Sequence, residues 1–98
     1  MVNYYTPAIQ LIPKEALHLY IFPKEDVLPN RSAQVYRYRC LEKAVILGNG
    51  SKGKVRIVFQ TTAGPKMVET TVWGVAEDTI VIKNGDSIPV HAIRDVGF

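Results

Sequence analysis

The chain has 98 residues, of which 47% are hydrophobic and 21% are charged. This length and balance are typical of an ordinary globular domain and exclude a second one, so we expect a single domain over residues 1–98. The formal net charge of +3 allows an anionic partner without requiring one, since twelve basic residues are opposed by nine acidic ones. A chain of this size buries only about 65% of its unfolded surface, so self-association can supplement a thin core.

The single cysteine, Cys40, has no partner for an internal disulfide, which suits a reducing compartment. The most apolar run, 16–22, is shorter than the roughly 20 residues that span a bilayer, and Pro23 stops it. The first seven residues lack the basic segment that opens a signal peptide. We therefore predict a cytoplasmic protein that does not enter a membrane.

Residues 1–30 hold four of the six prolines, and proline both fixes φ and lacks a ladder donor. This segment is predicted to be a proline-rich N-terminal arm without a long element. Residues 17–22 alternate as in a short edge strand, which we favour, whereas Pro13 at a first helical position suits two turns of helix. Tyr4 and Tyr5 are expected to cover part of the folded core.

Residues 31–47 are predicted to form a helix. Asn30 or Ser32 can cap its start, and Gly48 fits the position just after its end. A strand is the alternative, because residues 35–40 alternate, but the good helix formers that follow favour the helix. Helical spacing puts six side chains on one buried face, namely Tyr36, Cys40, Leu41, Ala44, Val45 and Leu47.

Residues 48–53 are rich in glycine and predict an irregular turn, because a phosphate loop would end in Gly-Lys-Ser/Thr and lead into a helix. Residues 54–98 then read as a β core of five short strands joined by tight turns. In the first strand Val55, Ile57 and Phe59 alternate with polar neighbours, as expected for a half-buried strand.

Residues 66–76 predict a second, long strand in which Gly74 is the natural place for a bend or bulge. Asn84-Gly85 is a strong hairpin signal between a third strand at 79–83 and a fourth at 87–90. Pro89 marks the fourth strand as an edge or a bulge. A single tight turn at 91–93 leads into the last strand.

This half of the chain carries two resemblances. The strings Val68-Glu-Thr-Thr-Val-Trp73 and Ile82-Lys-Asn-Gly-Asp-Ser-Ile-Pro resemble those of a group of short uncharacterised bacterial proteins, which implies no activity. The order of a helix, five short strands and a closing Val90-His-Ala-Ile-Arg-Asp-Val is similar to the Sm-like RNA-chaperone fold, whose barrels form rings by pairing edge strands. We therefore expect a mainly β fold: a small five-stranded SH3-like or Sm-like barrel with one packed helix and the proline-rich arm.

The Sm-like resemblance implies a uridine pocket made by a glutamine and an aromatic residue after the second strand and by a Lys-His pair near the end. Here Thr79 and Ile80 fall at the first pair, and Val90 and His91 fall at the second. Only His91 matches, so the resemblance implies the fold more strongly than the pocket.

No constellation for catalysis is evident. His18 and His91 are the only histidines, and no cysteine or carboxylate is spaced to join them as ligands. We therefore predict a protein that is not an enzyme, with no metal, no cofactor and no small-molecule substrate.

Basic residues near aromatic ones are candidates for RNA binding, because single strands are held by stacking and by cations on phosphates. The alternative places Tyr36 and Tyr38 between helix and barrel and leaves the cations in water. The candidate contacts are Arg37, Arg39, Lys52, Lys54, Arg56, Lys66 and His91, with four of them (52, 54, 56 and 66) expected at one end of the first hairpin.

Met67 and Trp73 are candidates for an interface with a second copy, if their side chains are exposed. An ordinary core position is the alternative for Trp73. The predicted function is a non-catalytic binding or assembly module that forms a homo-oligomer, and the alternative is an Sm-like protein that binds single-stranded RNA.

Overall fold

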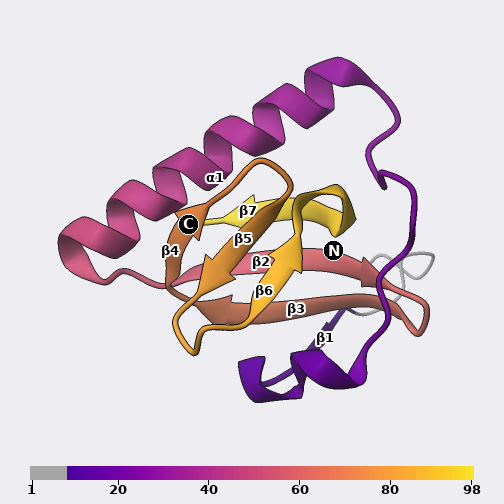
Figure 1. Ribbon diagram of the computed structural model, residues 1–98, viewed down its shortest axis with the longest axis horizontal. Coiled ribbons are helices and arrows are strands. Elements are labelled where there is room, and N and C mark those ends of the chain that lie inside the picture. Colours follow the sequence, from indigo (N-terminus) through magenta and orange to yellow (C-terminus); the bar gives the residue numbers. More distant parts are fainter. Residues whose placement is uncertain (1–8) are drawn as a thin grey trace, which may run out of the picture.

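The computed structural model describes residues 9–98, so the expectation for Tyr4 and Tyr5 lies outside the described residues. This part of the chain is mainly β, with seven strands in two sheets and one α-helix (Figure 1). The first sheet has the order β1 (Gln10–Leu11), β3 (Gly64–Thr70), β2 (Val55–Thr61), β7 (Ile93–Gly97). The second has the order β4 (Val72–Val75), β5 (Thr79–Ile82), β6 (Ser87–Pro89).

The strand count differs from the predicted five for two reasons. The long strand predicted over 66–76 is divided at Thr71 into β3 and β4, which belong to different sheets, and the arm adds β1. The bulge expected near Gly74 is confirmed, since the β4–β5 register shifts between Val72 and Gly74 with Trp73 as the extra residue. Dividing the strand lets one continuous segment cover two sides of the core.

The predicted turns are confirmed around β6. The Asn84-Gly85 segment joins β5 and β6 as an antiparallel hairpin, and Gly85 has a φ of 88°, a conformation that favours glycine. β6 is an edge strand of its sheet, as Pro89 indicated. A 3-10 helix, η2 (Val90–Ala92), forms the tight turn before β7.

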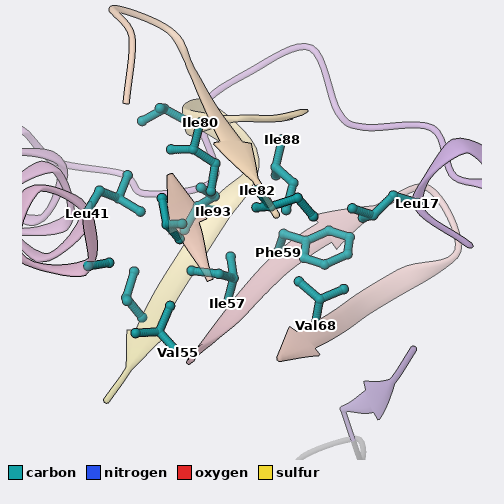
Figure 2. Packing of buried hydrophobic residues seen from close by; sticks show 14 of the residues in the cluster. Leu17, Leu41, Val55, Ile57, Phe59, Val68, Ile80, Ile82, Ile88 and Ile93 are labelled. Atoms are coloured by element: carbon teal, nitrogen blue, oxygen red, sulfur yellow. The ribbon is translucent and has the colours of Figure 1, made fainter. Parts of the chain in front are cut away.

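The core lies between the two sheets, and β2 is a central strand of the first sheet. Val55, Ile57 and Phe59 are buried as their alternation predicted, and β2 pairs with β3 on one side and β7 on the other. Figure 2 shows these side chains facing residues of β5 and β6, with Leu41 of the helix and Leu17 of the arm at opposite sides of the cluster.

The helix prediction is confirmed over the strand alternative, but the helix is longer than expected. It is α1 (Arg31–Ser51), and the Asn30 side chain accepts a hydrogen bond from the Ala33 N–H at 2.8 Å. Gly48 therefore lies inside the helix, and Lys52, with a left-handed φ of 55°, ends it. Gly48 serves packing, because a Cβ there would lie 2.3 Å from the Val72 carbonyl oxygen. The prediction of an irregular segment is thus wrong for residues 48–51.

The buried face of α1 is made by Arg37, Leu41, Ala44 and Gly48, with Cys40, Val45 and Leu47 half-buried. The prediction that Tyr36 belongs to this face is wrong, since 68% of the residue is exposed. One helical step separates Tyr36 from Arg37, and the arginine occupies the inward direction.

In the arm, the prediction of a strand at 17–22 is wrong, and the alternative of a short helix is correct, although the helix is of the 3-10 type. A 3-10 helix, η1 (Lys14–Leu19), begins directly after Pro13. It is preceded by β1, which pairs in parallel with β3, and it buries Leu17 in the core. Within residues 9–98 no helix combines the length and the apolar character needed to cross a membrane.

Candidate functional site

Arg37 was predicted to contact nucleic acid, and the structure corrects this, because only 6% of the residue is exposed. Its guanidinium donates two hydrogen bonds to the Asp26 carboxylate, from Nη1 to Oδ1 at 2.8 Å and from Nη2 to Oδ2 at 2.7 Å. Nη1 also donates to the Ile93 carbonyl oxygen at 3.1 Å. The bonds from Arg37 hold the pKa of Asp26 below its ordinary value. Arg37 therefore fastens the arm to β7 and is not available to a phosphate.

The alternating tyrosines and arginines of 36–39 do not share one face, because this segment is helical. Tyr36 and Tyr38 are both exposed, so neither fills the helix–sheet interface as the alternative had placed them. A hydrogen bond with Cys40 is the main cause that raises the pKa of Tyr36, and the charge of Cys40, desolvation and the charge of Asp95 add to it in that order. Arg39 remains exposed and lines a shallow hollow of about 440 Å³ with Arg31, Ser32, Val35 and Tyr36.

Lys66 and His91 are both engaged with the arm. Lys66 Nζ donates to Gln10 Oε1 at 2.7 Å and lies 5.5 Å from the centroid of the Tyr20 ring. His91 Nε2 lies 2.6 Å from the Pro23 carbonyl oxygen, a contact that requires the proton on Nε2. Both side chains therefore hold the arm against the strands, and a role in RNA binding stays a prediction for them.

The four basic residues expected at one end of the first hairpin are not together. Lys66 pairs with Phe59 toward the β2–β3 turn, so its placement was wrong. The other three lie near the start of β2: Lys52 ends α1, Lys54 precedes β2, and Arg56 is its second residue. The cationic cluster therefore comprises Lys52, Lys54 and Arg56, all of them exposed.

Phe98, which the sequence predictions did not include, lies beside this cluster and is 64% exposed. The register that pairs Arg56 with Gly97 brings the end of β7 to the start of β2. A hollow of about 360 Å³ forms there, lined by Lys54, Val55, Arg56, Glu69, Gly97 and Phe98. The chain separates Phe98 from Lys54 by more than forty residues, so no local pattern indicates their meeting.

The two interface candidates lie in different sheets. Met67 is half-buried on β3, where it pairs with Val58 on one side and with Leu11 of the arm on the other. Trp73 is 49% exposed at the bulge of β4, so the core alternative does not describe it. The exposed Val81 pairs with Gly74, next to Trp73. These two exposed side chains form what we call the Trp73 patch.

The outward direction of the Trp73 patch follows from burial along the same strands. Val72, Ile80 and Ile82 are buried, whereas Trp73 and Val81 are exposed. Side chains alternate between the two faces of a sheet, so the exposed pair lies on the outer face of the β4–β5 ladder. Apart from its two chain neighbours, a Cβ added at Gly74 would meet no atom within 4 Å, so the space at this position is open.

Within residues 9–98 no group of three or more His, Cys, Asp and Glu side chains is placed to hold a metal ion. Cys40 is half-buried and in no disulfide. The described residues thus present two surfaces of interest: the Trp73 patch, and the hollow between Phe98 and the cationic cluster. The absence of catalysis stays a prediction.

Comparisons with family models, with curated proteins and with solved structures give no match to this chain. The resemblance to the Sm-like fold therefore stays a prediction from the sequence.

Proposed function

We propose that this chain is a small non-catalytic binding or assembly module that self-associates. The observation that carries the proposal is the exposed Trp73 of the Trp73 patch. A tryptophan can bury roughly 250 Å², so a residue that is 49% exposed leaves about 120 Å² in water. At about 25 cal/mol per Å², covering that area contributes about 3 kcal/mol for each copy.

Association through side chains is favoured because the strand edges in the described residues are blunted. Edge strands are a template for pairing with another chain unless they are covered or shortened. β6 has three residues and contains Pro89, which lacks an N–H donor. On β7 the Ile93 carbonyl oxygen is taken by Arg37, and on β4 the Val72 carbonyl faces Gly48 of α1. The outer face of β4–β5 therefore offers the clearer contact surface.

We further propose that the fold is an SH3-like or Sm-like small barrel. Three features support this: β3 and β4 form one bent segment, β5 and β6 form a hairpin, and η2 leads into β7, which returns to pair with β2. The order of these elements after a helix is the order on which the resemblance rests. The arm adds β1 to the outer edge of β3.

The oligomeric state tests the assembly proposal directly. We expect light scattering and sedimentation to show a mass above that of the 11.0 kDa monomer at high micromolar concentration. Trp73 is the single tryptophan, so its emission should shift to the blue as the concentration rises and the ring becomes covered. A protein that stays monomeric throughout this range overturns the proposal.

Two variants locate the contact. Trp73→Ser is expected to weaken association at least tenfold, because about 1.4 kcal/mol corresponds to that factor and the ring contributes more. Ile46→Ser is the matched control, since Ile46 is a strongly exposed apolar residue on α1, outside the Trp73 patch. If Ile46→Ser weakens association and Trp73→Ser does not, the contact is on the helix and the Trp73 patch is rejected.

The second candidate function is binding of single-stranded RNA. It is favoured by Lys54 and Arg56, which share a hollow with the exposed ring of Phe98. We expect the wild-type protein to bind labelled single-stranded RNA with an affinity that falls as salt rises, since counterions are released when cations pair with phosphates. An affinity that does not change between two salt concentrations excludes this candidate.

A further inference from the structure

Phe98 stands between two hollows of different character. One, of about 390 Å³, is lined by Lys43, Ile46, Leu47 and Phe98 and is almost wholly apolar. The other is the basic hollow of about 360 Å³ described above, in which Phe98 meets Lys54 and Arg56. Because Phe98 lines both, this residue is shared by an apolar compartment and a cationic one. We call this arrangement the Phe98 site.

The apolar compartment is suited to a flat group. Ile46 is 72% exposed and Leu47 is half-buried, so both supply aliphatic surface that no described side chain covers fully. Lys43 Nζ lies over the Phe98 ring, 5.5 Å from its centroid, in a cation–π contact. A planar ring that displaces the Lys43 ammonium from this face would stack on Phe98 and stay within reach of its positive charge.

The charged side chains that line the cationic compartment are two cations, Lys54 and Arg56, and one carboxylate, Glu69. Arg56 Nε lies 3.1 Å from Glu69 Oε2, so the charge of Arg56 is already paired. Among the described residues, Lys54 lies within 4.0 Å of no carboxylate, which leaves one cation of this compartment without an ion pair. The same holds for Lys43 of the apolar compartment. The compartment therefore favours an anion, and Glu69 is the group that would compete with it.

We propose that single-stranded nucleic acid binds at the Phe98 site, with a base stacked on Phe98 in the apolar compartment and the adjoining phosphate held by Lys54 and Arg56. This inference rests on the second candidate function and names its site. A nucleotide is the ligand that joins a planar stacking group directly to an anion, as the two compartments require. An acidic peptide supplies the anion, but its apolar groups are separate side chains.

Substitutions at the site are expected to change the affinity for RNA and the salt dependence of that affinity in different ways. Phe98→Leu keeps an apolar side chain but loses the stacking face, and we expect it to weaken binding about tenfold, since stacking of one base is worth about 1–3 kcal/mol. Phe98→Tyr should bind as the wild type does. The double variant Lys54→Gln/Arg56→Gln should reduce the salt slope by about 1.4, because each lost phosphate contact on a single strand contributes about 0.7.

Glu69 gives a test of opposite sign. Glu69→Gln removes the carboxylate that pairs with Arg56, so it should tighten binding several-fold and not weaken it. Lys24→Gln is the control for net charge, because Lys24 is exposed in the arm, next to the Pro23 carbonyl held by His91. Phe98, Lys54, Arg56 and Glu69 are outside the buried core, so circular dichroism and thermal melting should report folded variants.

The experiment is fluorescence anisotropy with a fluorescein-labelled ten-nucleotide single-stranded RNA at two salt concentrations, on the wild type and each variant. The proposal is supported if Phe98→Leu and the double variant weaken binding while Lys24→Gln does not. Wild-type binding that all Phe98-site variants leave unchanged overturns the site but not the function. No binding by the wild type overturns both, and tighter binding of an acidic peptide of equal charge overturns the nucleotide assignment.

Discussion

Gly48 gives the sharpest test of how α1 packs on the strands. In an isolated helix, replacing glycine by alanine stabilises by up to about 1 kcal/mol. At position 48 the new Cβ would lie 2.3 Å from the Val72 carbonyl oxygen and 2.9 Å from Thr71 Cγ2. The first of these atoms is backbone, so α1 or β4 must move.

The expected cost of Gly48→Ala follows from these two opposing effects. Overpacking a well-packed contact costs about 1–3 kcal/mol, and the upper end applies because the obstacle is a backbone oxygen. Subtracting the gain in helix propensity leaves a loss of about 2 kcal/mol in the free energy of unfolding. For a domain of this size that loss lowers Tm by about 8–16 °C.

Gly50 is the matched control in the same helix. A Cβ at Gly50 would meet no atom within 4 Å, so Gly50→Ala should gain only the propensity term, about 0.5 kcal/mol near the helix end. Urea unfolding and thermal melting followed by circular dichroism measure both variants. If Gly48→Ala is as stable as Gly50→Ala, α1 does not pack on β4 as described, and the reasoning is refuted.

Two further predictions concern buried polar groups. Within the described residues, the buried Thr70 Oγ1 has no hydrogen-bond partner, whereas Thr71 Oγ1 donates to the Lys52 carbonyl oxygen at 3.3 Å. Thr70→Val should therefore raise the free energy of unfolding by about 1 kcal/mol, and Thr71→Val should lower it. Equal urea midpoints for the two variants would contradict this. Asp26→Asn should cost about 2 kcal/mol at neutral pH, because it leaves the buried Arg37 charge without its anion. Since Arg37 lowers the pKa of Asp26, the stabilisation is complete above the unfolded pKa of about 3.9 and is lost as the pH falls through the lowered folded value, so unfolding of the two proteins should converge in acid.

Local patterns were sufficient wherever a short stretch of sequence decides the structure. The alternation of Val55, Ile57 and Phe59 predicted a half-buried strand, because side chains in a strand point to opposite faces. Asn84-Gly85 predicted the β5–β6 hairpin, because that turn needs positive φ. Asn30 predicted the start of α1 through its side-chain cap. Each of these outcomes is set by residues within a few positions of one another.

Local patterns failed where a distant partner decides the outcome. Gly48 looked like a helix end, yet the close approach of Val72 keeps a glycine inside the helix. Arg37 looked like a surface cation, yet it is buried and donates hydrogen bonds to Asp26 and to the Ile93 carbonyl. Without such partners, burying the charge would cost too much free energy. The alternation of residues 17–22 favoured a strand, yet the arm forms a 3-10 helix that buries Leu17 in the core.

The sequence by itself determined that this is a mainly β chain with one capped helix, a proline-rich arm and a hairpin at residues 84–85, because periodicity, caps and turn residues act over a few positions. Only the tertiary structure decided which charges remain available and what lies beside them. The antiparallel pairing of β2 with β7 brings Phe98 to Lys54 and Arg56, and the bulge in β4 leaves Trp73 on the outer face. Both surfaces arise from strand register, which depends on how distant segments share one core.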